Sequence, residues 1–180
     1  ESTFCRGAKT VEKGVTVLPK ALSDTQGKPT VSISMTPGSF TYDTKVHQVK
    51  DKNIVVMNLI GRTDMNVLSE NPFTVAENLV DKLSKEADII VLDFHAEATA
   101  EKIAMRHFLD GKVNILFGTH THVQTADEQI TEKGTAYITD LGMTGPINSV
   151  IGMGVEESVK RFVTSLPERY KLAEGSCMLN

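Results

Sequence analysis

Three apolar runs with helix-like segments between them dominate the middle of the chain. The runs cover residues 53–60, 88–94 and 113–117, and each has the length and continuity of a strand covered on both faces. Asn71 and Pro72 begin a helix-like segment whose apolar stripe is Phe73, Ala76, Leu79, Val80 and Leu83. Residues 96–108 predict a second helix, with apolar positions at Ala98, Ile103, Ala104 and Phe108. The alternation predicts an α/β fold with right-handed crossover connections.

The flanks of this region have shorter patterns. Residues 15–18 and 30–35 are candidate strands, and His47 lies in a polar segment expected at the surface. Residues 127–130 and 135–140 predict a hairpin with a glycine in its turn. Residues 155–165 predict an amphipathic helix, and residues 169–172 a further strand. The apolar face of that helix is Val155, Val159, Phe162 and Val163.

Composition narrows the class of protein. The 180 residues fit one domain that can bury a core without help from disulfides. A formal net charge of −4 argues against nucleic acid as a general partner. The sequence holds neither an apolar run of membrane-spanning length nor a signal-peptide segment, so we expect a cytoplasmic protein whose Cys5 and Cys177 are reduced thiols. It begins at Glu1 without a methionine, which indicates a piece of a longer protein.

Three histidines follow the predicted strands. His95 comes directly after residues 88–94, while His120 and His122 come after residues 113–117 and Gly118. The carboxyl ends of neighbouring parallel strands meet at one edge of a sheet, where ligands bind. In an extended segment His120 and His122 point the same way, so both could face one cation or two adjacent ones. Thr121 would then face away from the metal, or toward the substrate if the loop twists.

Two kinds of metal chemistry are compatible with this pattern. Three neutral histidines around one ion leave a position for water, which is the arrangement of a mononuclear zinc hydrolase or hydratase. A two-metal site needs bridging carboxylates, and the nearby acids Asp93, Glu97 and Asp140 do not have the placement of a bridging ligand. The visible residues therefore make half of a dinuclear site.

Three motifs carry a resemblance to a known family. They are residues 93–102 (DFHAEATAEK), 117–127 (FGTHTHVQTAD) and 134–146 (GTAYITDLGMTGP). Together they resemble the YmdB-type family of calcineurin-like metallophosphoesterases, over about residues 53–180. The resemblance implies a sandwich of β-sheets flanked by helices, and two divalent metal ions, commonly iron or manganese, with zinc as a further option. It also implies hydrolysis of phosphodiesters, with cyclic nucleotides, above all 2′,3′-cyclic ones, as substrates.

The resemblance assigns roles to the three histidines. It implies that His95 and His120 hold one metal and that His122 holds the other. The family's other ligands and its catalytic histidine belong to GD, NGEN and GNH motifs, none of which occurs in residues 1–52. We therefore expect residues 1–52 to be a divergent segment of uncertain fold and residues 53–180 to be the C-terminal part of a metallophosphoesterase domain. No catalytic or substrate-binding residue is assigned within this chain. Either the chain is a fragment of the full enzyme or its N-terminus has been replaced, and in both cases we do not expect this chain alone to be active.

Two alternatives make different predictions. A mononuclear zinc hydrolase binds one metal tightly per chain, whereas a regulatory protein that keeps the fold without the site binds none and turns nothing over. For the preferred interpretation, the partner is a small phosphodiester or cyclic nucleotide, with neither membrane nor general nucleic-acid binding. A homo-oligomer is compatible with the sequence.

Overall fold

The computed structural model describes residues 31–32, 42–66 and 68–178. The described residues divide into two compact units, one that ends at Leu141 and one that begins at Gly142, and each is described by itself. The predicted strand at residues 15–18, and most of the one at residues 30–35, lie outside the described residues.

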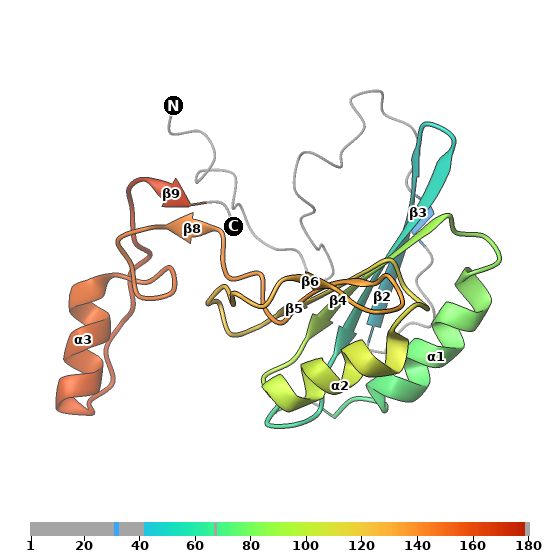
Figure 1. The fold of residues 1–180 in the computed structure, drawn as a ribbon. Helices are drawn as coiled ribbons and strands as arrows, with labels where there is room; N and C mark the ends of the chain where they lie inside the picture. The colour runs from blue at the N-terminus through green and yellow to red at the C-terminus, as the bar shows by residue number, and fades with distance from the viewer. Residues whose placement is uncertain (1–30, 33–41, 67, 179–180) are drawn as a thin grey trace. The chain divides into compact units, whose positions relative to one another are not determined.

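A seven-stranded sheet forms the centre of the larger unit (Figure 1). Its strand order is β1-β2-β3-β4-β5-β7-β6. Strands β3, β4, β5 and β7 are parallel, whereas β1 and β2 on one side and β6 on the other are antiparallel to their neighbours. The strands are β1 Val31–Ser32, β2 Tyr42–Val49, β3 Lys52–Ile60, β4 Ile89–His95, β5 Ile115–Thr119, β6 Gln129–Ile130 and β7 Ala136–Ile138. The predicted α/β class, the three central strands and the hairpin are confirmed.

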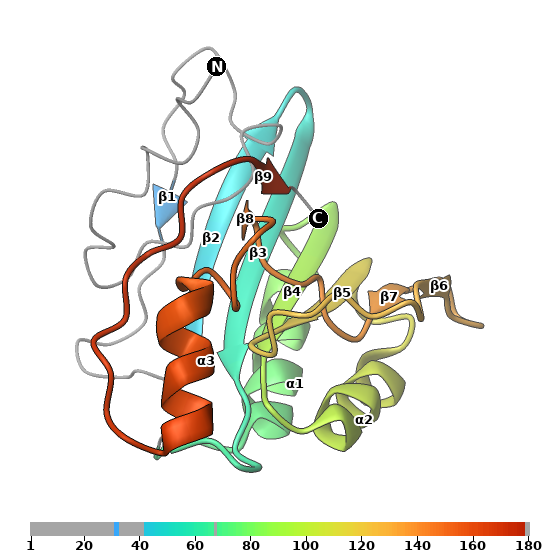
Figure 2. The same cartoon turned by 90° about the vertical axis from the view of Figure 1, so that its left-hand side faces the viewer.

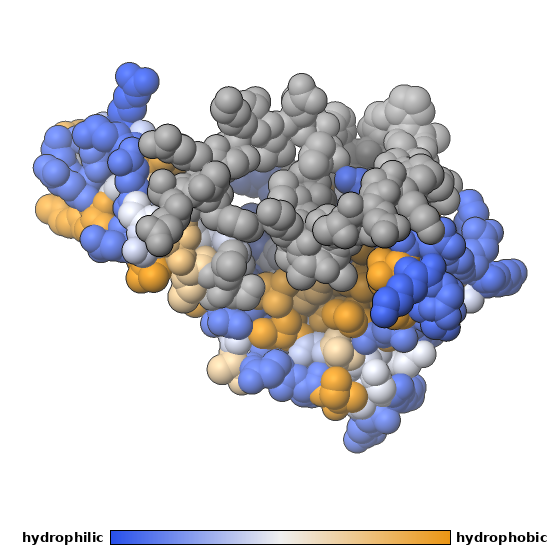
Figure 3. Space-filling view, turned by 90° about the horizontal axis from the view of Figure 1, so that it is seen from above, coloured by the Kyte–Doolittle hydropathy of each residue, from blue (hydrophilic) through white to orange (hydrophobic). Residues whose placement is uncertain are grey.

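Helices α1 (Pro72–Leu83) and α2 (Thr99–Leu109) cover one face of this sheet (Figures 1 and 2). The Phe73 and Phe108 rings pack edge to face between them, with centroids 5.5 Å apart. The core lies between helices and sheet, and its buried side chains alternate along β3 as Val55, Met57 and Leu59. The opposite face of the sheet also has apolar residues, among them Ile115 at 40% exposed. Figure 3 looks onto that side and shows hydrophobic residues gathered there.

The first helix forms as its sequence predicts. The Asn71 side chain caps it by accepting a hydrogen bond from the Phe73 amide at 3.0 Å, and Pro72 occupies the first turn. Its expected stripe is buried in the structure, apart from a partly buried Phe73. The capping residue and the helical period therefore define this element correctly.

The second helix differs from the expectation in its start and its buried face. It begins at Thr99 rather than at residue 96, and it buries Lys102, Met105 and Leu109. The expected position Ala104 is exposed. The reason is Lys102, which is 1% exposed and pairs with a buried carboxylate, so that the helix is turned with a charged side chain inward.

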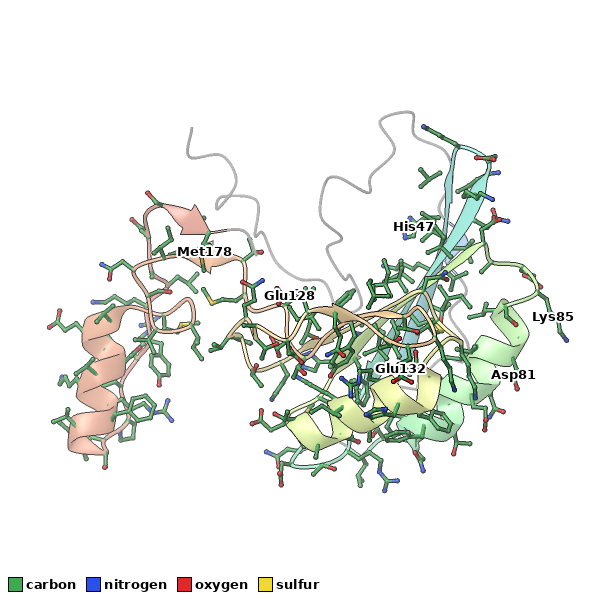
Figure 4. The ribbon with its side chains drawn as sticks, viewed as in Figure 1. His47, Asp81, Lys85, Glu128, Glu132 and Met178 are labelled. Carbon is green, nitrogen blue, oxygen red and sulfur yellow. The ribbon has the colours of Figure 1, made fainter. Side chains whose placement is uncertain are left out.

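Strand β2 was not expected, and it changes the interpretation of His47. Residues 42–49 pair along their whole length with β3, from Tyr42 opposite Leu59 to Val49 opposite Lys52. His47 lies within this strand (Figure 4) and is half-buried, so the predicted surface position is wrong. Its Nε2 is buried, and no hydrogen-bond partner for it is found in the described part of the chain. It lies on a different strand from the other candidate histidines.

The smaller unit has little sheet. Strands β8 (Gly145–Pro146) and β9 (Cys177–Met178) pair antiparallel, and helix α3 spans Val155–Thr164. The predicted helix is confirmed, but its apolar side chains are exposed, from 42% at Val155 to 77% at Val163. The predicted strand at residues 169–172 is reduced to one isolated bridge, Met153 with Leu172.

Two further expectations concern the state of Cys177 and the absence of a membrane-spanning segment. Cys177 is not a free thiol, so the expectation of a reduced thiol is wrong for it. None of the helices that the structure describes has the length and apolar character needed to cross a bilayer.

Candidate metal centre

The carboxyl ends of β4 and β5 bring two histidines together. His95 is the last residue of β4 and lies opposite Thr119, the last residue of β5, in a parallel register. His120 follows at once, and its Nδ1 lies 3.0 Å from Nε2 of His95. The two rings meet edge to face with centroids 4.8 Å apart. The prediction that these strands are neighbours is confirmed.

A chain of hydrogen bonds fixes the tautomer of His95. Asn58 donates to one oxygen of Asp93 at 2.8 Å, and the Thr119 hydroxyl donates to the other at 2.7 Å. Because the hydroxyl proton points to Asp93, the Thr119 oxygen must accept the bond of 3.1 Å from Nδ1 of His95. Nε2 of His95 is then left as the acceptor that faces His120. A hydrogen-bonded second nitrogen of this kind is the usual support of a metal-binding histidine.

The electrostatics favour the neutral form of His95. Burial lowers the pKa of His95, the positive charge of a protonated His120 lowers it further, and the Asp93 carboxylate opposes both. Burial also disfavours the charged form of Asp93 and so raises the pKa of its carboxyl group. The hydrogen bonds from Thr119 and Asn58 act in the opposite direction and lower this pKa. A neutral imidazole is the form that binds a metal.

His120 has its own carboxylate. Its Nε2 lies 3.1 Å from an oxygen of Glu97, and both side chains are partly exposed. The carboxylate contacts the ring nitrogen that does not face His95. Glu97 therefore orients His120 in the way that a carboxylate orients a metal-binding histidine.

The two histidines of the HxH pair do not lie in an extended segment, so the expected geometric reason for their spacing is wrong. His120 has φ of 112° and His122 of 68°, both in the region that side chains disfavour. The loop therefore turns sharply, and the Thr121 hydroxyl donates to the buried Asp140. His122 is exposed, and it makes no hydrogen bond or ion pair with the residues that the structure describes.

The three acidic side chains near the histidines each contact a different group. Asp93 supports Thr119, Glu97 contacts His120, and Asp140 binds Lys102 and Thr121. Glu101, further along α2, accepts hydrogen bonds from the amides of Arg62 and Thr63 after β3 and so closes that loop. These contacts are those of groups that support neighbouring side chains and backbone amides.

The donor set fits one metal ion in part. Two imidazole nitrogens converge at the ends of two strands. The other nitrogen of His95 is hydrogen-bonded to Thr119, and the other nitrogen of His120 lies 3.1 Å from a Glu97 oxygen, a set that suits a divalent ion of the first transition row. Within residues 42–66 and 68–178 no group of three or more His, Cys, Asp or Glu side chains is arranged to hold an ion. The residues present thus fit two ligands of one ion.

Several supporting residues were not found from the sequence. Asn58 and Thr119 look like ordinary strand residues, and only the register of three strands brings them to Asp93. Lys102 did leave a signal, since Met105 and Leu109 stand three and seven residues after it and define the same helix face.

The comparisons with known proteins agree with the resemblance of the motifs. The model of the family described as YmdB-like protein matches residues 28–180, an earlier start than residue 53. The chain is 50% identical over 129 residues to the 2′,3′-cyclic-nucleotide 2′-phosphodiesterase of Bacillus subtilis, covering 72% of this chain and 48% of that protein. It is 41% identical over 137 residues to a putative phosphatase/phosphodiesterase of Mycoplasma pneumoniae, covering 75% of this chain and 48% of that protein. The chain thus spans about half the length of these curated relatives.

Two solved structures share the fold. A hypothetical protein from Thermus thermophilus has a TM-score of 0.69 at 38% identity, with 74% of this chain and 52% of that chain covered. A structure described as a novel phosphatase, from Mycoplasma pneumoniae, has a TM-score of 0.65 at 41% identity, with 73% and 47% covered. The strands and helices that position the histidines therefore belong to a fold already seen in relatives.

Proposed function

This chain belongs to the YmdB-like protein family, and we propose from that premise that it supplies the histidine-bearing part of a metal-dependent phosphodiesterase. The substrates proposed are cyclic nucleotides, the 2′,3′-cyclic ones first. The proposed cofactors are two divalent ions, iron or manganese before zinc. His95 and His120 would bind one ion, and His122 would bind the other.

One observation carries this proposal. Nε2 of His95 and Nδ1 of His120 lie 3.0 Å apart at the carboxyl ends of two parallel strands, and the remaining nitrogen of each ring is tied to a neighbour. Histidines kept only for packing would not need both arrangements. The activity named for the Bacillus subtilis relative supplies the substrate class.

The residues of this chain would orient the two histidines that bind the metal. Asp93 and Thr119 hold His95 in the tautomer with a free Nε2, and Glu97 orients His120. Bound divalent ions would polarise the phosphoryl oxygens and lower the pKa of an attacking water. The partly exposed position of His120 and the exposed position of His122 leave this side of the loop open to a small substrate.

The test is metal content together with hydrolysis of 2′,3′-cyclic AMP by the protein that carries this sequence, compared with its His120→Ala variant. We expect the variant to lose bound metal and more than about 100-fold in rate, beyond what loss of a supporting group costs. Equal metal content and equal rates in both proteins would contradict the proposal. One tightly bound zinc that His122→Ala weakens as strongly as His120→Ala does would favour the mononuclear alternative, in which all three histidines hold one ion. Absence of both metal and turnover would favour a regulatory role.

A further inference from the structure

We infer that the buried ion pair of Lys102 and Asp140 is an anchor that positions the histidine loop, residues 120–122, for metal binding. The inference rests on the proposed function, because it concerns the affinity of the same site. It assigns a role to two residues that are not themselves expected to touch a metal or a substrate.

Asp140 joins two elements through one oxygen. Its Oδ2 accepts from Lys102 Nζ on helix α2 at 2.8 Å, from the Thr121 hydroxyl at 2.7 Å and from the Thr121 amide at 3.1 Å. Thr121 stands between His120 and His122. The carboxylate therefore fixes both the side chain and the backbone of the residue that links the two histidines.

The backbone around the anchor is built for close approach. A Cβ on Gly118 would lie 1.8 Å from the Thr139 carbonyl oxygen and 2.9 Å from Cδ of Lys102. Only glycine lets β5 approach both the residue before Asp140 and the stem of Lys102. The Leu141 amide also donates to the Gly118 carbonyl at 3.0 Å. The end of β5 and the segment after β7 are thus held in close contact next to the loop.

The burial of this pair points to a positioning role. Both side chains are 1% exposed, and burying two charges costs free energy that an apolar pair of the same size would not cost. The loop above it has two non-glycine residues at positive φ, a conformation that persists only where the surroundings impose it. Charged hydrogen bonds to Thr121 are the contacts that impose it here.

The test measures the loop and the metal separately. Thr121→Val removes the hydroxyl bond and leaves the ion pair intact, while the double variant Lys102→Met with Asp140→Asn removes both charges and leaves no unpaired buried ion. Asp88→Asn is the matched control, since Asp88 also accepts an amide and a lysine but precedes β4 at the other end of the strand from His95. Amide hydrogen exchange at Thr121 and in β4 is followed by NMR, and affinity for Co²⁺ alone by its visible absorption.

In Thr121→Val and in the double variant, we expect faster amide exchange at residue 121, with the amides of β4 still protected. We also expect the affinity of both variants for Co²⁺ to fall about 10- to 100-fold. The Asp88→Asn control keeps the affinity of the unaltered chain. Unchanged affinity and unchanged exchange at Thr121 would overturn the inference, as would an equal loss of affinity in the control. If the unaltered chain binds no Co²⁺, the proposed metal site fails, and the exchange at Thr121 alone then decides the anchor.

Discussion

The two ends of the parallel strands each hold a lysine–aspartate pair, in very different surroundings. At the amino end, Lys52 lies 3.0 Å from Asp88, with side chains 54% and 36% exposed. At the carboxyl end, Lys102 lies 2.8 Å from Asp140, and both are 1% exposed. Each aspartate also accepts a backbone amide, that of Asn53 at one end and that of Thr121 at the other.

The same kind of ion pair therefore has a different role at each end of the strands. The exposed pair joins β3 to the start of β4 at low cost and with little gain, as surface pairs do. The buried pair is costly to form, and it stands where a strained loop has to keep one conformation. Burial of the charges, rather than their pairing, therefore distinguishes the end of the sheet that carries the site.

Lys102→Met is expected to have the largest effect. The variant keeps the stem of the side chain but leaves the buried Asp140 without its cation, which costs about 3–5 kcal/mol of the free energy of unfolding. Urea unfolding measures this loss. A loss as small as that of an exposed pair would show that the carboxyl-end pair is not desolvated in solution.

Thr119→Val comes next. The change keeps the β-branched shape and removes the hydroxyl that links His95 to Asp93, so His95 loses its fixed tautomer. We expect metal affinity to fall about 10- to 100-fold while the fold is kept. Isothermal titration with Mn²⁺ or Zn²⁺ measures the affinity, and an unaltered dissociation constant would rule out the Asp93–Thr119 link as support for a metal ligand.

Lys52→Met is the counterpart at the amino end. Because its partner Asp88 remains solvated and keeps the Asn53 amide, the loss of unfolding free energy should be far smaller than that of Lys102→Met. Metal affinity should not change. A loss comparable to that of Lys102→Met, measured in the same urea series, would remove the distinction between the two ends.

The pH dependence of stability gives the smallest predicted effect. The Asn53 amide and the Lys52 side chain hold the pKa of Asp88 below its ordinary value of 3.8. A carboxylate whose pKa is lower in the folded than in the unfolded state stabilises the fold at pH values above its unfolded pKa. This stabilisation is lost as the pH falls through its folded pKa. Below pH 3.8 the unaltered chain should therefore lose stability more steeply than Asp88→Asn. Equal slopes in acid unfolding of the two proteins would contradict this assignment.

The sequence predicted the framework of this site better than its interior. The helical period and the capping residue predicted α1, and the continuity of the apolar runs predicted the three central strands. The face of α2 was predicted wrongly, since the apolar rule places a lysine outside and cannot foresee that Asp140 lies beneath it. Strand β2 was not predicted because its alternation is carried by polar as well as apolar residues.

The histidines show the same limit. Their placement after the strands brought His95 and His120 together, as expected, because parallel strands end at one edge of the sheet. The extended geometry assumed for His120 and His122 was wrong, because the conformation of the loop depends on Thr121 and a carboxylate that follows another strand. Pairwise spacing carries no information on such long-range polar contacts.

The proposed function depends above all on Nε2 of His95 and Nδ1 of His120 being two ligands of one divalent ion. ¹⁵N NMR of the histidine ring nitrogens, recorded while the chain is titrated with Zn²⁺, observes both ligands at once. We expect these two nitrogens to shift together at the same zinc concentration, while Nδ1 of His95 remains protonated toward Thr119. Ring nitrogens of His95 and His120 that do not respond to zinc, or that respond at separate concentrations, would contradict the proposed site.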